Sequence, residues 1–539
     1  MKPRSFQAAR TRRCVLLLAA AFGLRGIFFS LALPYSDPLD EVFHFGYAAF
    51  LASTGRPPRA AEPSMPEEML RPLGLQPRSA LPGPRLSWRD AARLSPEERD
   101  RRWREAFPSV PPAATLVVTT NYESQQPPLF YLGAASLLRA LSALPLDRRL
   151  LVLRLAATLL AALVVPLAHA FFRRLFPRRT ALAATAAFVA FPGIGSFVGR
   201  FTNDALALPI VVGLLVTFAD TARGRLSRAR AVLLALLLAI GCWTKLYVLL
   251  LLPAAPLAAL LAPAARRSSV LLRASAASAA SFLAVIPWLA RQHADTGDWF
   301  GILASRQATR LGLGILERLA ALPDLLHARF AIVFARTFLW PGTWSAMGAP
   351  RFVAVLLFLT LTLVILIPLA LQGRSPLRRR VWLGSAVVLP LFALGYAAYA
   401  STFAAVARLR GHSPSAGPDG WYLLILLPVL LAAGCARGHC VPSTLLLVAT
   451  GVFIAAEASL TLGVLPAVYA GWTTPNGSNA SVSAWAPMVA APGLALQTYA
   501  RVGLARASIP LLAGILGSAL LALLAAVFPV VRHPVPRGQ

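Results

Sequence analysis

The sequence is poor in acidic residues and lacks the motifs of common soluble enzymes. Its 539 residues include 21 Asp and Glu against 52 Lys and Arg, and all charged residues together make up only 14% of the chain. The Walker loop, the dinucleotide-binding fingerprint, the Gly-x-Ser-x-Gly elbow and the His-Glu-x-x-His zinc motif are all absent. These absences argue against a cytoplasmic enzyme that uses ATP or a nucleotide-sugar, which would also need a soluble domain.

Cysteine is equally scarce, and its spacing fits neither a zinc site nor a disulfide framework. The cysteines lie in or beside apolar runs, so we expect them to act as small apolar side chains. They are Cys14, Cys242, Cys435 and Cys440.

Apolar residues are what the chain has in abundance. They account for 57% of the sequence, and the mean hydropathy is +0.65, whereas soluble domains are roughly 45–50% apolar. Nearly uncharged runs recur, each close to the ~20 residues that a helix needs to cross a bilayer. The first run, 14–34, is not followed by a small-residue cleavage site, so we expect a retained helix. The composition therefore predicts an all-α polytopic membrane protein.

The net charge of +31 is unevenly distributed along the sequence. Seven short segments hold 23 of the 52 basic residues and no acidic residue, whereas the loop 35–126 has 11 basic and 12 acidic residues. The positive-inside rule then places both termini in the cytoplasm and the long loop outside. We expect no nucleic-acid partner. The seven segments are 1–13, 173–179, 222–230, 264–273, 372–380, 436–440 and the tail from 532.

We expect about twelve transmembrane helices. The segment 127–145 is interpreted as re-entrant or interfacial, because a full span there would reverse every later loop. The expected helices lie near 14–34, 150–172, 180–198, 204–221, 231–246, 247–262, 271–289, 351–371, 381–400, 421–436, 441–462 and 508–531.

The large first outer loop, 35–126, is expected to carry short interfacial helices. One is predicted at 88–106, where Ser95 and Glu98 have the spacing of a capping box. A second outer segment, 290–350, holds tryptophans of the kind favoured at membrane interfaces.

Polar chemistry is concentrated directly after the first helix. Asp40 and Glu41 are adjacent carboxylates, and His44 follows one helical turn later. Such residues can serve as a general base, as ligands of a divalent metal, or as both. A solvated acidic turn that caps the next helix is the structural alternative.

Two further hairpin tips bring cations to the same predicted face. Arg200 and Asp204 flank one tip, with Asn203 between them, and Lys245 lies at the next. A salt bridge, a helix cap or a lysine that snorkels to the interface would explain each tip alone. Their convergence with the first-loop carboxylates favours a site.

The end of the long loop adds two polar candidates. Glu123 and Gln126 precede a Pro-Pro step, and their side chains could bind sugar hydroxyls or cap the following helix. Farther along, Glu457 lies within an apolar run, and we expect it to be paired inside the bundle.

These motifs, in this order, resemble the polyprenyl-phosphate-sugar-dependent glycosyltransferases of the GT-C superfamily, over about residues 15–430. The bacterial branches related to protein mannosyltransferases and lipid A aminoarabinose transferases are most similar. Two departures are Trp421 where relatives have arginine in a Gly-Arg-Tyr step, and Phe130 where tyrosine is frequent. The matching residues are Asp40, Glu41, His44, the run 126–131, Arg200, Asn203, Asp204, Thr244, Lys245, Pro287, Trp288, Gly297, Asp298, Trp421 and Tyr422.

The resemblance implies a GT-C-like catalytic module at 1–430, with additional helices at 431–539 around an outer loop at 463–507. It implies that the first loop supplies the catalytic carboxylate, Asp40 or next Glu41. Arg200 and Lys245 are then expected to bind the donor phosphate. Substrate-binding candidates are His44, Glu123, Gln126, Asn203, Asp204 and Tyr422.

The expected function is inverting transfer of a sugar from a polyprenyl-phosphate carrier to a glycan, lipid or protein acceptor outside the cytoplasm of a bacterium. A divalent metal at Asp40, Glu41 and His44 stays open. The alternative is a transporter or flippase of lipid-linked sugars, which would favour inverted repeats and polar, broken helices near the midplane. The polar residues gather instead at one face.

Overall fold

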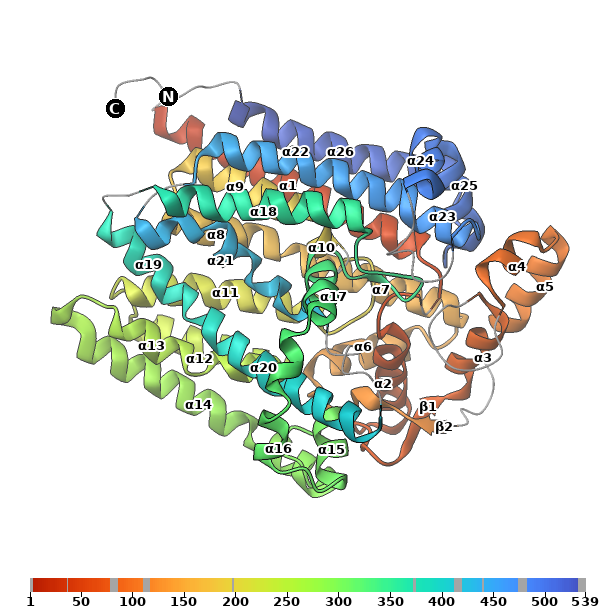
Figure 1. Cartoon of the computed structure of the whole chain (residues 1–539), viewed down its shortest axis with the longest axis horizontal. Coiled ribbons are helices and arrows are strands. Elements are labelled where there is room, and N and C mark those ends of the chain that lie inside the picture. Colours follow the sequence, from red (N-terminus) through yellow and green to blue (C-terminus); the bar gives the residue numbers. More distant parts are fainter. Residues whose placement is uncertain are drawn as a thin grey trace.

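The computed structural model describes residues 3–35, 37–77, 86–109, 117–195, 198–371, 375–411, 419–438, 441–473 and 482–531, and the predicted all-α architecture is confirmed in these ranges. Long helices run side by side along the longest axis (Figure 1). The bundle consists of α1 (Pro3–Ala32), α7 (Leu146–Ala162), α8 (Val164–Leu175), α9 (Arg178–Ala190), α10 (Pro192–Gly195), α11 (Asp204–Ala222), α12 (Arg228–Thr244), α13 (Ala254–Leu260), α14 (Ala264–Thr296), α18 (Arg351–Ala370), α19 (Pro376–Ala386), α20 (Val388–Leu409), α21 (Leu427–Leu431), α22 (Ser443–Ser459), α23 (Leu465–Tyr469) and α26 (Ile509–Val531).

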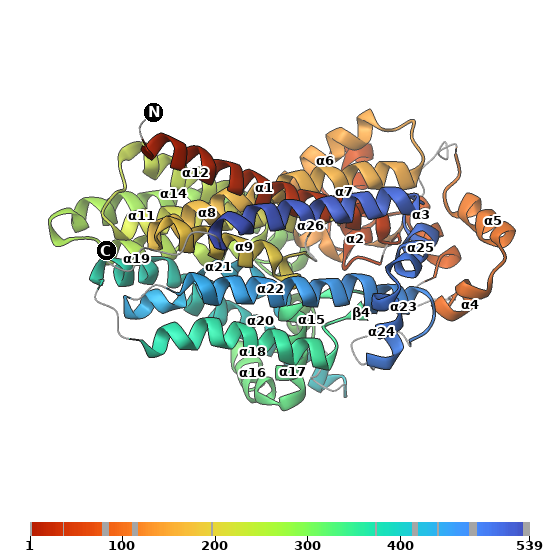
Figure 2. The same cartoon turned by 90° about the horizontal axis from the view of Figure 1, so that it is seen from above.

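Packing within the bundle joins segments from both ends of the sequence. The helix α1 packs along α26, α9 packs against α22, and α12 against α14. The start of α1 and the end of α26 lie at the same end of the bundle, which we call the termini end (Figures 1 and 2). Short elements cluster at the opposite end, which we call the loop end.

The loop end is built from the first outer loop and from two later segments. The first loop forms α2 (Glu41–Thr54), β1 (Pro63–Pro66), α3 (Glu67–Leu75), α4 (Trp88–Arg93), α5 (Pro96–Ala106) and β2 (Val117–Thr120), and leads into α6 (Leu129–Ala140). The later segments form α15 (Leu303–Arg310), α16 (Ile315–Leu319), α17 (Ala328–Leu339), β3 (Gly342–Thr343), β4 (Ala346–Met347), α24 (Val482–Ala490) and α25 (Pro492–Val502). Both β-pairs are antiparallel.

Eight helices of the described residues are long and apolar enough to cross a membrane. Each of the twelve predicted ranges falls on a helical segment, but some of these segments are shorter or broken. The range 247–262, for example, is a 3₁₀ helix at Leu246–Leu251 followed by the short α13. The eight are Gln7–Ala32, Leu146–Leu175, Asp204–Ala222, Ala264–Thr296, Arg351–Ala370, Pro376–Leu409, Ser443–Tyr469 and Ile509–Val530.

Two predicted boundaries are corrected by the structure. The predicted helix at 271–289 is part of α14, which continues to Thr296 and ends where Gly297 adopts the left-handed conformation, with φ 74°. The second outer segment therefore begins later than predicted. The predicted helix at 88–106 is two helices, α4 and α5, with the Ser95 hydroxyl accepting from the backbone N–H of Glu98 at 3.2 Å. The predicted N-cap at Ser95 is confirmed.

The segment predicted to be re-entrant or interfacial forms α6. This helix has 12 residues, so it is about 18 Å long at 1.5 Å per residue. The hydrocarbon core is roughly 30 Å thick. The helix is too short to cross it alone, and its place relative to the bilayer stays a prediction.

The buried charge of α22 has a partner, as predicted. Arg25 of α1 lies with its Nη1 atom 3.9 Å from the Oε1 atom of Glu457. The pair joins the first helix to a late one, directly before a π-helical turn at Leu460–Val464. Cys14, Cys242 and Cys435 are buried, and Cys440 lies outside the described residues.

Candidate active site

The turn between α1 and α2 is held by Arg154 of α7. Its guanidinium donates hydrogen bonds of 2.8–3.1 Å to three carbonyl oxygens at the end of α1, which have no partner within the helix. It also binds both carboxylate oxygens of Glu41, at 2.8 Å and 2.6 Å. Both side chains are fully buried. The three carbonyl acceptors belong to Ser30, Leu33 and Pro34.

This anchoring leaves Asp40 in a tight turn at the start of α2. Asp40 has φ 62° and ψ 0°, the left-handed conformation, and its side chain does not cap the helix. Aspartate and asparagine tolerate this region better than other non-glycine residues, but it still costs energy. The neighbouring Glu41 binds Arg154 and also accepts from the backbone N–H of Phe201 at 2.9 Å. The two adjacent carboxylates therefore face different surroundings.

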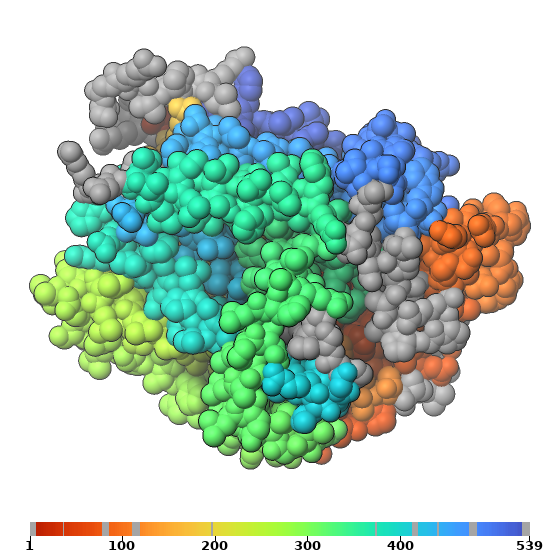
Figure 3. Space-filling view, viewed as in Figure 1, coloured from red at the N-terminus to blue at the C-terminus, as the bar shows by residue number. Residues whose placement is uncertain are grey.

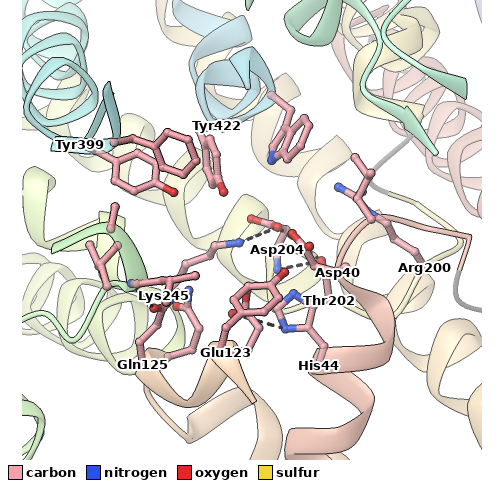
Figure 4. Close-up of a pocket in the computed structure, with 18 residues that line it drawn as sticks. Asp40, His44, Glu123, Gln125, Arg200, Thr202, Asp204, Lys245, Tyr399 and Tyr422 are labelled. Carbon is pink, nitrogen blue, oxygen red and sulfur yellow. Dashed lines mark hydrogen bonds and ion pairs between the residues drawn. The ribbon is translucent and has the colours of Figure 1, made fainter. Parts of the chain in front are cut away.

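Asp40 lines a small cavity of about 120 Å³ at the loop end of the bundle (Figure 4). The wall is assembled from the starts of α2 and α11, the end of α12, the segment before α6, and α20. The polar lining residues are Asp40, His44, Tyr122, Glu123, Gln125, Gln126, Arg200, Thr202, Asp204, Lys245, Tyr399 and Tyr422.

Two cations approach Asp40 from separate hairpins. The Nζ atom of Lys245 lies 2.6 Å from the Oδ2 atom of Asp204, and Arg200 lies on the other side of Asp40 (Figure 4). Burial raises the pKa of Asp40, while a hydrogen bond from the Tyr122 hydroxyl and the charges of Arg200 and Lys245 oppose that rise. The site is thus a carboxyl group with a raised pKa beside two positive charges.

The lower wall in Figure 4 carries uncharged polar groups at neutral pH. Burial, with the nearby charges of Lys245 and Arg200, lowers the pKa of His44 to about 3. Burial and the charge of Asp40 raise the pKa of Glu123 to about 8. Although His44 Nδ1 lies 3.9 Å from Glu123 Oε2, this contact is not an ion pair at pH 7. His44 is instead positioned by Tyr131, whose hydroxyl lies 2.7 Å from Nδ1.

Two buried oxygens in this wall have no hydrogen-bond partner among the described residues. They are Glu123 Oε2 and Gln126 Oε1, and both residues line the cavity. Leaving a buried polar atom unsatisfied costs about 1–3 kcal/mol. A ligand rich in hydroxyl groups would remove that cost.

Aromatic side chains and the second outer segment close the remaining sides. Tyr399 and Tyr422 meet edge to face, with ring centroids 6.1 Å apart. Leu303, at the start of α15, donates its backbone N–H to Gln125 Oε1 at 3.2 Å. In Figure 3 the green α15–α17 region and the cyan end of α20 lie side by side at the lower middle of the front face.

The structure brings eight of the ten predicted site residues to the cavity. They are Asp40, His44, Glu123, Gln126, Arg200, Asp204, Lys245 and Tyr422.

Glu41 and Asn203 do not line the cavity. Glu41 binds Arg154, and Asn203 donates to the carbonyl oxygen of Thr244 at 3.1 Å, which ties the α11 hairpin to the end of α12. Among the described residues, no three His, Cys, Asp or Glu side chains are placed to hold a metal ion. The set Asp40, Glu41 and His44 does not fit a metal, because the Glu41 carboxylate turns away to Arg154.

The sequence did not point to several residues that line the cavity, nor to Arg154, which holds the turn between α1 and α2. Tyr122 directly precedes the candidate Glu123, and Thr202 lies between the candidates Arg200 and Asn203. Tyr399 lies in the apolar helix α20. Arg154 carried a readable signal, because an arginine within an apolar run is costly unless it is paired. Its partner, 113 residues away, could not be named from the sequence.

Comparison with known proteins supports the resemblance seen in the sequence. Residues 126–290 match the family model of dolichyl-phosphate-mannose-protein mannosyltransferases, and this range contains Gln126, Arg200, Asp204 and Lys245. The match confirms the resemblance to GT-C glycosyltransferases. No curated protein sequence matches the chain.

Two solved structures are similar at low sequence identity. ArnT from Cupriavidus metallidurans, bound to undecaprenyl phosphate, is 14% identical with a TM-score of 0.44, and the alignment covers 95% of this chain and 76% of ArnT. The apo oligosaccharyltransferase of Archaeoglobus fulgidus is 13% identical with a TM-score of 0.42. That alignment covers 97% of this chain and 55% of the archaeal chain.

Proposed function

We propose that this membrane glycosyltransferase of the GT-C type transfers a sugar from a polyprenyl-phosphate carrier to an acceptor on the outer side of the membrane. The observation that carries the proposal is the position of Asp40, a buried carboxyl group with a raised pKa that faces a cavity beside Arg200 and Lys245. The matched family is described by a dolichyl-phosphate-mannose donor, which belongs to the same donor class. The acceptor is a hydroxyl or amine of a glycan, lipid or protein.

The proposed reaction is a single displacement at the anomeric carbon. Asp40 accepts the proton of the acceptor group as its oxygen or nitrogen bonds to that carbon. The bond between the carbon and the phosphate oxygen breaks at the same time, and its electron pair leaves with the polyprenyl phosphate. Arg200 and Lys245 stabilise the charge on that leaving group. A single displacement inverts the anomeric configuration.

The other lining residues are assigned to substrate binding. Glu123 and Gln126 offer oxygens that lack hydrogen-bond partners in the described part of the chain, and we propose that sugar hydroxyls satisfy them. His44 and Tyr422 shape the sugar pocket from opposite walls. Glu41 and Asn203 act by positioning the turn and the hairpin rather than by touching the substrate.

The proposed module 1–430 contains every residue that lines the cavity. The part after 430 supports it, since α26 packs along α1 and the hydroxyl of Tyr469 binds Asp37 at 2.5 Å. We propose a bacterial plasma-membrane location with both termini in the cytoplasm, supported by the distribution of basic residues.

The test of the function is transfer of radiolabelled sugar from synthetic polyprenyl-phosphate donors to membrane extracts by the purified protein. Transfer with at least one donor supports the proposal. Lipid-linked sugar that crosses the bilayer of proteoliposomes, without transfer from any donor, would favour the flippase.

Lys245→Gln is expected to raise the KM for the donor by about ten- to a hundredfold, because a hydrogen bond to a charged group contributes roughly 1.5–3 kcal/mol. Lys245→Arg should recover part of the loss, since it keeps the charge. Initial rates over a range of donor concentrations measure the effect. Arg291→Gln is the control, because Arg291 is a cation of the loop end that binds Pro57 and does not line the cavity. An unchanged KM in Lys245→Gln would contradict the assignment.

The KM for the donor is also expected to rise as the pH passes about 8. Glu123 has its pKa raised to about 8, so it carries its proton at neutral pH and becomes negative above that value. The charged groups that face it are Asp40, Lys245 and Asp204, and a new negative charge among them opposes binding of a phosphate.

Glu123→Gln should remove this alkaline rise, because glutamine has the shape of the protonated acid and cannot ionise. The comparison variant is Asp419→Asn, since burial raises the pKa of Asp419 to about 7. That variant should keep the rise near pH 8. Profiles of KM against pH check both variants, and an identical alkaline limb in Glu123→Gln would refute the role of Glu123.

A further inference from the structure

A second cavity lies at the termini end of the bundle, far from the chemistry of Asp40. It has a volume of about 490 Å³ and lies between the first turns of α1, the last turns of α8 and the start of α9. Ligand pockets commonly have volumes of roughly 300–1,000 Å³. Its polar lining consists of Thr11, Arg12, His169, Arg173 and Arg178.

The charge of this cavity is of one sign. Three of its lining residues are arginines and none is acidic. The sequence has no Asp or Glu in 1–36 or in 148–203, the segments that contribute the lining. Nearby, Asp220 of α11 is already bound by Arg174, with Oδ2 and Nη2 2.9 Å apart. The positive charge of the lining is therefore not neutralised by an acid of the cavity wall.

Local structure adds to the preference for an anion. Arg173 donates to the carbonyl oxygen of Phe176 at 3.0 Å, and Arg178 donates to Gln7 Oε1 at 3.5 Å. Both acceptors are neutral, so these contacts hold the guanidinium groups without offsetting their charge. The 13-residue helix α9 begins at Arg178, and its N-cap, Pro177, provides no side-chain hydrogen bond. The start of a helix attracts anions through its free N–H groups and its dipole.

Apolar surface continues from the cavity along the membrane-spanning helices. Leu16 of α1 lines the cavity and is 64% exposed. On the neighbouring α7–α8 stretch, Leu159 is 66% exposed and Leu163, between α7 and α8, is 54% exposed. Both residues lie in the candidate span Leu146–Leu175, within three turns of the cavity wall. A ligand that fits both regions has an anionic head and hydrocarbon chains.

We propose that this cavity binds the phosphate headgroup of an anionic membrane phospholipid, with its acyl chains lying along the exposed leucines. Arg12, Arg173 and Arg178 bind the phosphate oxygens. The acyl chains distinguish a lipid from a soluble phosphate of the same headgroup chemistry. The site is independent of the donor-binding cavity, so it stands or falls separately from the proposed transfer reaction.

The test is lipid retention by the purified, delipidated full chain, measured by native mass spectrometry with phosphatidylglycerol and phosphatidylcholine of matched acyl chains. The wild-type protein should retain about tenfold more phosphatidylglycerol than phosphatidylcholine, or better. Each basic residue near an anionic lipid contributes of the order of a fivefold preference. Arg173→Gln combined with Arg178→Gln should abolish the preference.

The matched control combines Arg266→Gln with Arg267→Gln. These arginines are exposed at the start of α14 and do not line the cavity. Their replacement removes the same charge from the same end of the bundle. The control should keep the preference, and equal loss in both double variants would refute a specific site. Arg173→Lys with Arg178→Lys keeps the charge and should retain phosphatidylglycerol, which guards against a simple folding defect. Full competition by soluble glycerol phosphate would overturn the assignment to a lipid.

Discussion

Asp40→Asn is expected to reduce kcat for sugar transfer by roughly 100- to 10,000-fold, the range that a positioned general base contributes. The variant should fold normally. Asparagine has the same shape as aspartate, and it tolerates the left-handed conformation that Asp40 adopts with φ 62°. Alanine would be a poorer choice, because it would add backbone strain to the loss of the carboxylate. Single-turnover rates with a saturating donor measure the chemical step.

Glu67→Gln provides the control for this experiment, since it neutralises a carboxylate of the same outer loop that does not line the cavity. It should transfer sugar at the wild-type rate. Transfer that survives in Asp40→Asn would show that another group accepts the proton. Loss of lipid flipping in proteoliposomes by Asp40→Asn, with transfer intact, would assign Asp40 to a transport step and overturn its role as the base of the transfer reaction.

The sequence could predict the architecture because apolar runs and basic loops are strong, local signals. A run such as 351–371 has the length and the apolar composition of a membrane helix, and α18 occupies it. Boundaries set by tertiary contacts were less predictable. The helix α14 continues past the predicted end at 289, where the composition turns polar, because its last turns pack beside the first loop: Gln292 donates to the carbonyl oxygen of Ser124 at 3.3 Å.

The sequence could predict which hairpin tips form the candidate site, but not which role each of their residues has. Asp40 and Glu41 are adjacent in sequence and chemically similar, so only their surroundings separate them. One faces the cavity, and the other is bound by Arg154, a residue that the sequence places in a different helix. Long-range pairing of this kind has no local signature. The same limit applied to Glu457, which was expected to be paired although Arg25 could not be named.

The buried pair between Glu41 and Arg154 leads to the second large expected effect. Arg154→Met should lower the free energy of unfolding by about 3–5 kcal/mol, the usual cost of removing one partner of a buried ion pair. The Glu41 carboxylate would lose its ion-pair partner at a fully buried position. The carbonyl oxygens of Ser30 and Pro34 would lose the donor that Arg154 provides as well. Because this network sets the turn that presents Asp40, sugar transfer should fall along with stability.

Thermal unfolding of the purified protein in detergent measures the loss of stability. The double variant Arg154→Met with Glu41→Gln should unfold at a higher temperature than Arg154→Met alone, because the unpaired charge has been removed. Sugar transfer should nevertheless stay low in the double variant, since the turn at Asp40 still lacks its anchor. An Arg154→Met protein as stable and active as the wild type would mean that the network does not hold the turn. Full activity in the double variant would show that the site needs charge balance at this buried position, and not the hydrogen bonds of Arg154.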